Sequence, residues 1–314
     1  MFSPRQSVLF LDHNLQCYLL TPPLNKCCAL MSGFSLPAKL LQCIADLPGS
    51  PRSIALCPDF EFGAWRYKRL AEHLFDWLPD VALRPKERET LLYEPNKTLA
   101  RSCRRLFDTD DPSKRGEVGE ILLHAVCRQE FGTAPFVARL FYKMRTNDSV
   151  TSVDVVHVRY DDSSKKLELW LGEAKLYDDV QSARYKAYDS VKPLWDPEFL
   201  HEMKALIGPK IEEGSPHGEE LAWLFEEETS LDQIVSRLVI PICIAADFPA
   251  TKDAAARSAE YIGSVAAELE EAKKYLEERV PVEVRFVVIF VPLDCKQKLE
   301  TAVNDRVKSC LLYT

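Results

Sequence analysis

The chain has 314 residues, of which 46% are hydrophobic and 28% charged, a composition typical of a globular protein with one large or two small domains. It has only 11 glycines and neither a G-x-G-x-x-G nor a G-x-x-x-x-G-K-[ST] motif, which argues against a Rossmann dehydrogenase or a P-loop ATPase. The net charge of −8 argues at first against a nucleic-acid ligand, but residues 196–280 alone hold 19 acidic and 8 basic side chains. The rest of the chain is slightly basic and therefore compatible with a phosphate ligand.

Residues 1–95 mix short apolar runs with proline-containing breaks, and Leu70, Leu74 and Leu78 recur at helical spacing. We expect a small N-terminal α/β segment over 1–95, followed by a larger domain over 96–314. The N-terminus lacks the continuous apolar stretch of a secretory signal, and no apolar run approaches the roughly 20 residues that cross a bilayer. The 10 cysteines contain no C-x-x-C spacing, so we expect buried thiols in a cytoplasmic protein without membrane contact.

The clearest patterns begin after residue 108. Hydrophobic periodicity predicts a helix over 114–131, strands over 136–144, 150–160 and 167–176, and a helix over 178–192. The short turns between the three strands favour antiparallel hairpins. An acidic helical insertion is expected over 196–236. Beyond it we predict a strand over 239–246, a helix over 254–279, a strand over 282–293 and a helix over 296–311, and hence an α/β fold with a mixed sheet flanked by helices.

The strand predicted over 167–176 carries an unusual charged pair. Residues two apart share one face of a strand, so Glu173 and Lys175 follow three leucines on a face that is otherwise apolar. The same E-x-K spacing occurs at residues 202–204 and 271–273, but there it falls in predicted helices. An unpaired charge at the end of a buried face is costly, so the pair on the strand needs a salt bridge or a ligand.

Asp154 is the one acid among the apolar residues of the preceding strand. Antiparallel pairing would place it beside Glu173, with Lys175 one pleat away. Two adjacent carboxylates repel unless a cation lies between them, and Mg²⁺, with Mn²⁺ as a substitute, is the divalent ion that such a pair favours. Lys175 could then orient or deprotonate an attacking water and offset charge on a phosphoryl group.

The helix predicted over 114–131 offers further acids. Glu117, Glu120 and His124 lie on one stripe by their i+3 and i+4 spacing. A carboxylate of this stripe, Glu120 rather than Glu117, could reach the metal directly or through a water. His157 lies three residues from Asp154 and therefore on the opposite face of the strand, where we expect a packing or surface histidine.

The order of these features resembles that of the PD-(D/E)xK nuclease superfamily, whose fold is restriction-endonuclease-like: helix glutamate, strand, strand aspartate, turn, E-x-K strand, helix. Residues 114–120, 153–154 and 172–175 more narrowly resemble the HamA family, the nuclease subunits of the bacterial Hachiman antiphage systems. The later strands at 238–242 and 286–293 support this likeness, which covers residues 59–314. The residue before Asp154 is Val153, whereas the PD-(D/E)xK motif has a proline at this position.

The resemblance implies a role for each matched residue. Asp154, Glu173 and Glu120 correspond to the metal ligands, and Lys175 to the catalytic lysine. Gln181 and Tyr185, one helical turn apart, resemble the Q-x-x-x-Y signature of RecB-like nucleases, which implies that they help to position the substrate strand. Glu117 is a further candidate for this positioning role.

We therefore expect a Mg²⁺-dependent deoxyribonuclease that serves as effector of bacterial antiphage defence. The resemblance implies a helicase subunit, HamB, as the partner that restrains the nuclease until foreign or damaged DNA is engaged. Two alternatives remain. One is a non-catalytic adaptor that keeps the nuclease fold and binds the helicase or DNA, and the other is a stand-alone restriction-type endonuclease. The acidic residues 196–280 either mimic nucleic acid, meet a basic partner surface or form a solvated helical face.

Overall fold

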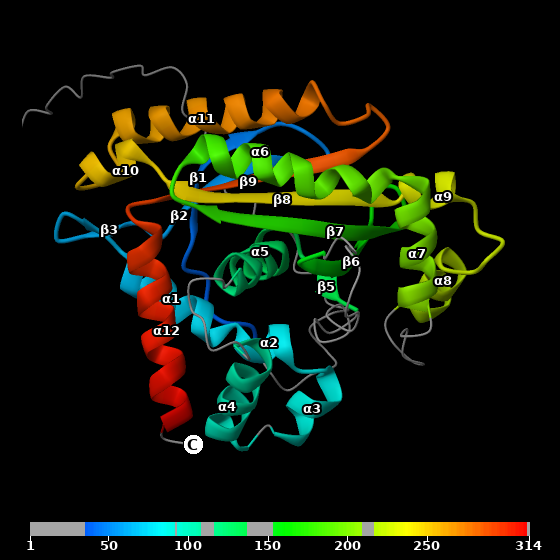
Figure 1. Cartoon of the computed structure of the whole chain (residues 1–314), viewed down its shortest axis with the longest axis horizontal. Helices are drawn as coiled ribbons and strands as arrows, with labels where there is room; N and C mark the ends of the chain where they lie inside the picture. The colour runs from blue at the N-terminus through cyan, green and yellow to red at the C-terminus, as the bar shows by residue number, and fades with distance from the viewer. Residues whose placement is uncertain (1–34, 92, 108–115, 137–152, 209–216, 313–314) are drawn as a thin grey trace, which may run out of the picture.

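The computed structural model describes residues 35–91, 93–107, 116–136, 153–208 and 217–312. Within them, seven strands form one mixed sheet, in the order β1 (Gln42–Leu47), β2 (Ser53–Cys57), β9 (Arg285–Leu293), β8 (Leu238–Asp247), β7 (Lys166–Tyr177), β6 (Val155–Asp161) and β5 (Ala134–Pro135). The four strands from β2 to β7 are parallel to one another, whereas β1, β6 and β5 join by antiparallel pairing. The predicted mixed sheet flanked by helices is confirmed (Figure 1).

The centre of the sheet is apolar on both faces. All but the last of the ten residues of β8 are buried, as expected for a central parallel strand that is covered on both sides. Helices α6 (Val180–Val191) and α11 (Ala259–Glu277) cover one face, and α5 (Glu117–Glu130) packs against the other (Figure 1). Strands β1 and β2, from the first hundred residues, extend the same sheet and contribute to the same core.

The remaining elements surround these layers (Figure 1). On the α5 side lie α1 (Tyr67–Asp76), α2 (Leu78–Ala82), α3 (Pro85–Thr90), α4 (Pro95–Leu106) and α12 (Lys296–Leu312). The predicted acidic insertion follows the 3₁₀ turn η3 (Lys192–Trp195) and contains the helices α7 (Pro197–Ile207), α8 (Gly218–Leu224) and α9 (Leu231–Val235). The hairpin of β3 (Phe60–Glu61) and β4 (Ala64–Trp65) and the short helix α10 (Pro249–Asp253) complete the described chain. None of the described helices is both long and apolar enough to cross a membrane.

Most of the predicted elements are confirmed, with shifted ends. The predicted helix over 254–279 begins at Ala259, because the Ser258 hydroxyl accepts a hydrogen bond from the Tyr261 N–H and caps the helix there. The strand predicted over 150–160 is β6, which begins at Val155. The strand predicted over 136–144 lies outside the described residues except for Phe136.

Gly172 lies where three strands approach most closely. The ladder between β7 and β8 is interrupted between residues 170 and 173, beside Pro241, which has no N–H to donate. A Cβ atom on Gly172 would lie 2.6 Å from both Pro241 Cγ and Val155 Cγ2. Only glycine fits between these side chains, and the close packing fixes the backbone immediately before Glu173.

We therefore expect Gly172→Ala to lower the free energy of unfolding by about 1–3 kcal/mol, the usual cost of overpacking. Gly263→Ala in α11 is the matched control, because a Cβ atom there meets nothing within 4 Å and alanine favours a helix interior by about 0.5–1 kcal/mol. Urea unfolding of both variants tests the prediction. Equal stability of the two would show that Gly172 is not sterically required.

Candidate active site

Asp154 and Glu173 meet where β6 begins beside β7. Val155 pairs with Gly172 in antiparallel register, and the Asp154 N–H donates to the Gly172 carbonyl at 2.9 Å. Asp154 therefore stands opposite Glu173, as the predicted pairing requires. Its side chain continues the ladder, because Oδ2 accepts a hydrogen bond of 2.8 Å from the Ala174 N–H. The aspartate is thus held by the backbone of the strand that carries Glu173 and Lys175.

Glu173 and Lys175 form a direct ion pair on β7. Lys175 Nζ lies 2.5 Å from Glu173 Oε1, and Glu173 is only 6% exposed. Ser190 of α6 hydrogen-bonds to Glu173, so the carboxylate lies on the face of the sheet that α6 covers. The other two E-x-K sequences lie in helices α7 and α11, so only this one places both charges on a strand.

Both acids have raised pKa values, chiefly because they are removed from water. Burial raises the pKa of Asp154 well above its usual value, and the charges of Glu173 and Glu120 raise it further. Burial also raises the pKa of Glu173, although Lys175 and hydrogen bonds with Ser190 and Asp154 oppose this. One lysine therefore does not balance the cluster. The site would be stabilised by a proton or a cation held between the two carboxyl groups.

Helix α5 brings Glu120 close to this pair. The helix can approach β7 because Gly119 has no side chain: a Cβ atom there would lie 3.4 Å from the Ala174 Cβ. The next residue, Glu120, is half-buried and acts electrostatically on Asp154. Glu117, one turn earlier on α5, is buried at 4% exposure. Of the two helix acids, Glu120 is the one whose charge acts on the pair.

Gln181 and Tyr185 lie on the outer face of α6. Both are exposed, Tyr185 to 48%, and the Tyr185 ring packs edge-on against Tyr275 of α11 with centroids 5.3 Å apart. Ala183 and Ala187 occupy the buried face of this helix. Among the described residues, no hydrogen bond joins Gln181 or Tyr185 to the carboxylates. The structure therefore does not bring these two residues into the cluster.

The donor atoms of the cluster fit a hard divalent cation. No three His, Cys, Asp or Glu side chains of the described residues converge into a closed metal cage. Asp154 and Glu173 form an open pair, with Glu120 nearby. Mg²⁺ usually binds through one or two carboxylates and keeps several waters, so this oxygen donor set suits it, whereas structural zinc prefers cysteine and histidine.

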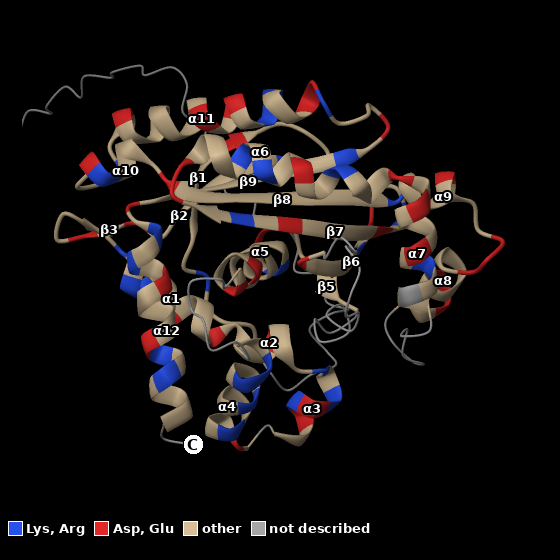
Figure 2. Ribbon diagram, viewed as in Figure 1, with Lys and Arg blue, Asp and Glu red and all other residues tan. Residues whose placement is uncertain are grey.

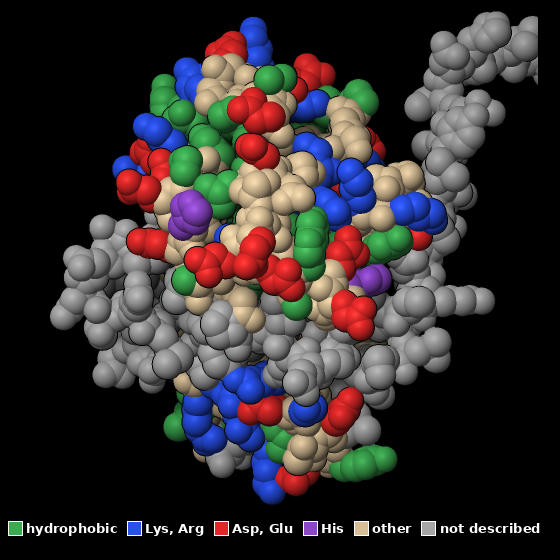
Figure 3. All heavy atoms as spheres, turned by 90° about the vertical axis from the view of Figure 1, so that its right-hand side faces the viewer, with side chains coloured by type: hydrophobic (Ala, Val, Ile, Leu, Met, Phe, Trp, Pro, Cys, Tyr) green, Lys and Arg blue, Asp and Glu red, His purple; other side chains and the backbone are tan. Residues whose placement is uncertain are grey.

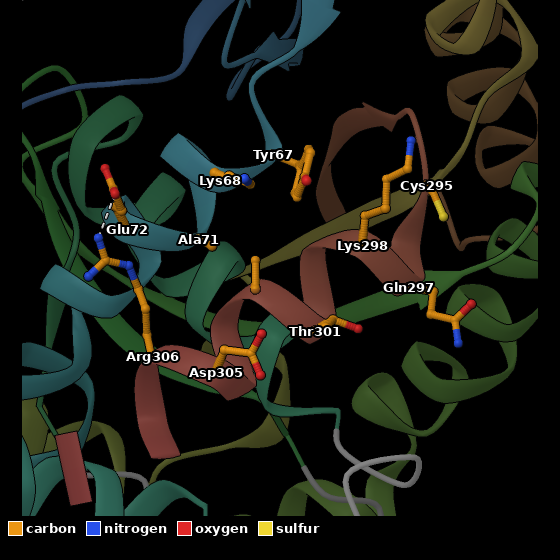
Figure 4. A pocket seen from close by; sticks show the side chains of 11 residues that line it. Tyr67, Lys68, Ala71, Glu72, Cys295, Gln297, Lys298, Thr301, Asp305 and Arg306 are labelled. Atoms are coloured by element: carbon orange, nitrogen blue, oxygen red, sulfur yellow. Dashed lines mark ion pairs between the residues drawn. The ribbon is translucent and has the colours of Figure 1, made fainter. Parts of the chain in front are cut away.

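A separate groove lies between α1 and α12 (Figure 4). Its volume is about 620 Å³, and its lining includes Tyr67, Lys68 and Thr301. Two of its cations are already paired, because Lys298 Nζ lies 2.7 Å from an Asp294 oxygen and Arg306 contacts Glu72 at 2.5 Å. None of the clustered carboxylates lines this groove, so the groove is distinct from the candidate active site.

Sequence reasoning missed a buried polar chain behind the site. Thr133 Oγ1 lies 2.8 Å from His157 Nδ1, and His157 Nε2 lies 3.0 Å from His124 Nδ1. His124 Nε2 in turn lies 2.8 Å from Asp80 Oδ2. Arg128 Nε also donates to Asp80 at 3.0 Å, and Arg88 contacts the same carboxylate. The chain links α2, α5 and β6, the last two being elements that position the acids. A signal was available in Asp80, a single acid within the otherwise apolar residues 77–83.

Burial keeps the histidines of this region neutral. His157 is a core histidine, one of the two placements that its strand position predicted. The pKa values of His124 and His157 lie well below the usual value, chiefly because burial penalises the charged form. Burial lowers the pKa of the neighbouring His73 to about 4, and His73 Nε2 accepts a hydrogen bond of 3.2 Å from the Trp77 indole.

Acidification should therefore destabilise the protein through His73. Its pKa is lower in the folded than in the unfolded chain, so the unfolded chain binds more protons and folding weakens as the pH falls from about 6.5 towards 4. Between pH 7.5 and 5.5 we expect wild type to lose about 1.4 kcal/mol more than His73→Gln, which keeps an acceptor for Trp77 but does not titrate. Urea unfolding at both pH values measures this difference. Equal losses would show that His73 does not titrate on unfolding.

Comparison with known proteins places the chain in a family. Residues 39–307 match the family model of HamA, which confirms the resemblance seen in the sequence. The chain is also 28% identical over 145 residues to Anti-bacteriophage protein A of Escherichia coli (strain K12), a match that covers 45% of this chain and 26% of that protein. The chain thus spans about a quarter of the length of this relative. Because the family model covers most of the sequence, the chain belongs to the HamA family.

Proposed function

We propose that this chain is a metal-dependent DNA nuclease and the effector of a defence against bacteriophages. The observation that carries the proposal is the cluster of Asp154, Glu173 and Lys175, in which a half-buried and a buried acid, both with raised pKa values, lie beside one lysine. The printed name of the relative, Anti-bacteriophage protein A, supports the defensive role.

The fold supports the same proposal. An aspartate at the start of β6, the E-x-K of β7 and a glutamate on α5 follow the chain order of the PD-(D/E)xK nucleases. We therefore assign a restriction-endonuclease-like fold to the sheet and its covering helices. A helicase subunit of the HamB kind is the proposed partner, and it would restrain the nuclease until DNA is engaged.

Each residue of the cluster has a chemical task in this proposal. Asp154 and Glu173 would hold Mg²⁺ or Mn²⁺, and Glu120 would assist directly or through a water. The bound metal supplies an activated water and polarises the phosphate. The Lys175 ammonium, now 2.5 Å from Glu173, would orient the water and offset the charge that develops on the phosphate oxygens.

A cleavage assay tests this proposal. Plasmid DNA is incubated with Mg²⁺ and the chain, alone and with the proposed helicase partner. We expect Lys175→Met to cleave at least about 100-fold more slowly than wild type, the usual effect of removing a group that handles a proton. Lys273→Met is the matched control, because Lys273 belongs to the E-x-K of α11, where its ammonium pairs with Glu277 and donates to the Pro48 carbonyl.

The same variants distinguish a nuclease from an adaptor. In a phage-protection assay, wild type and Lys273→Met should protect cells and Lys175→Met should not. Full protection by Lys175→Met, together with unchanged cleavage, would contradict the nuclease proposal. If wild type and both variants all protected cells and none of them cleaved DNA, the non-catalytic adaptor would be favoured.

A further inference from the structure

The surface of α3 and α4 is strongly basic in an acidic protein. Residues 84–107 hold seven basic and three acidic side chains, although the whole chain carries −8. Only Arg88 of these cations is buried, where it pairs with Asp80. Basic residues mark α4 in Figure 2, and basic side chains gather over α3 and α4 at the lower end of the face in Figure 3.

Three of these cations form one stripe along α4. Lys97, Arg101 and Arg104 lie at positions i, i+4 and i+7, on the face opposite the buried Ser102 and Leu106. The side chain of Lys97 is 74% exposed and that of Arg101 49%. Like charges at this spacing repel each other and weaken a helix. An anionic ligand bound along the stripe would relieve this repulsion.

Internal acids neutralise only part of the stripe. Glu87 of α3 pairs with Arg101 at 2.9 Å and with Arg105 at 2.6 Å, and Glu94 pairs with Lys97. Arg104 is exposed and forms no ion pair with any described residue. The stripe spans about 10 Å along the helix axis, enough for two neighbouring phosphates of a nucleic-acid strand.

An exposed aromatic ring precedes the stripe in the chain. Tyr93, in the turn between α3 and α4, is 91% exposed and precedes Lys97 by four residues. Cations beside aromatic rings are the usual combination in sites for unpaired nucleic acid, where the cations bind phosphates and the rings stack on bases.

We infer that the α3–α4 surface, comprising Tyr93, Lys97, Arg101 and Arg104, binds a single strand of DNA. This inference rests on the proposed nuclease function and adds the surface that holds the substrate. Helix α4 lies on the same side of the sheet as α5, which carries Glu120 (Figure 1). A purely acidic protein partner would use the cations but would not need the exposed ring.

Binding without cleavage tests the inference. A fluorescent single-stranded 20-mer is titrated with the full-length chain in EDTA at several salt concentrations, and anisotropy reports binding. The triple variant Lys97→Gln, Arg101→Gln, Arg104→Gln should lower the slope of log affinity against log salt by about 2, and the affinity at 0.1 M salt about 100-fold. Tyr93→Ala should weaken single-strand binding about tenfold and leave duplex binding unchanged.

A second triple variant controls for net charge. Lys165→Gln, Lys252→Gln, Lys274→Gln removes three cations that lie outside α3 and α4, and it should bind DNA like wild type. Thermal unfolding confirms that each variant is folded. Equal binding by wild type and the stripe variant, or equal losses in both triple variants, would overturn the inference.

The failure of this inference is distinguishable from the failure of the nuclease proposal. Hydrolysis of bis(4-nitrophenyl) phosphate with Mn²⁺ uses the carboxylate cluster but needs no DNA surface. The stripe variant should hydrolyse this small diester at the wild-type rate, and Lys175→Met should not. If wild type hydrolyses neither the diester nor DNA, the nuclease proposal fails, while the anisotropy result still decides whether the surface binds DNA.

Discussion

Asp80→Ala is expected to lower the free energy of unfolding by about 3–5 kcal/mol, the usual cost of removing one partner of a buried ion pair. Asp80 is buried and accepts from the Arg128 guanidinium at 3.0 Å and from the His124 ring at 2.8 Å, and Arg88 contacts the same carboxylate. Without it, the buried Arg88 guanidinium would lose the carboxylate that it contacts.

Urea unfolding followed by circular dichroism measures this loss. Asp162→Ala is the control, because Asp162 lies in a turn, is 66% exposed and faces Lys165 at 3.8 Å; we expect a change below about 0.5 kcal/mol there. A loss of less than about 1 kcal/mol for Asp80→Ala would show that the guanidinium groups find water or other partners.

Asp154→Asn is expected to have opposite effects on stability and activity. Without metal, the variant should be more stable than wild type by about 1–2 kcal/mol at pH 8, because it removes one of two repelling charges. Asparagine can still accept from the Ala174 N–H, as Asp154 does at 2.8 Å. DNA cleavage should fall at least about 100-fold, since one of the two metal-binding carboxylates is lost.

Thermal unfolding with and without Mn²⁺ tests this pair of effects. Mn²⁺ should stabilise wild type and have little effect on Asp154→Asn. The stabilisation should increase with pH, because both acids have raised pKa values and must lose their protons before they bind metal. Asp189→Asn on the exposed face of α6 serves as the control. If Asp154→Asn destabilised the metal-free protein, the carboxylate would have a structural role instead.

Local patterns predicted the elements that carry the site. The alternation of leucines before Glu173 and the apolar run from Leu238 identified β7 and β8. Long-range pairing could not be predicted in this way. Ile54 of β2 pairs with Ile289 of β9, and nothing in either segment indicates a partner 235 residues away. The addition of β1 and β2 to the sheet therefore depends on tertiary packing that has no local signal.

The candidate site was predictable only in part, for a similar reason. The alternation of apolar side chains along the strand predicted that Glu173 and Lys175 share one face. The short turn between the two strands predicted that Asp154 lies opposite Glu173. Ser190, which hydrogen-bonds to Glu173, was not predicted, because its contact depends on how α6 packs over β7. The spacing of Gln181 and Tyr185 suggested substrate contacts, yet the buried alanines of α6 turn both residues towards solvent.

The central claim is that Asp154 and Glu173 together bind a divalent metal. Anomalous diffraction from crystals soaked in Mn²⁺ tests it most directly, with Glu173→Gln crystals as the comparison. We expect one strong peak bonded to oxygens of both carboxylates in wild type, and no peak at that position in the variant. A wild-type map without a peak between them, or with an equal peak in Glu173→Gln, would contradict the claim.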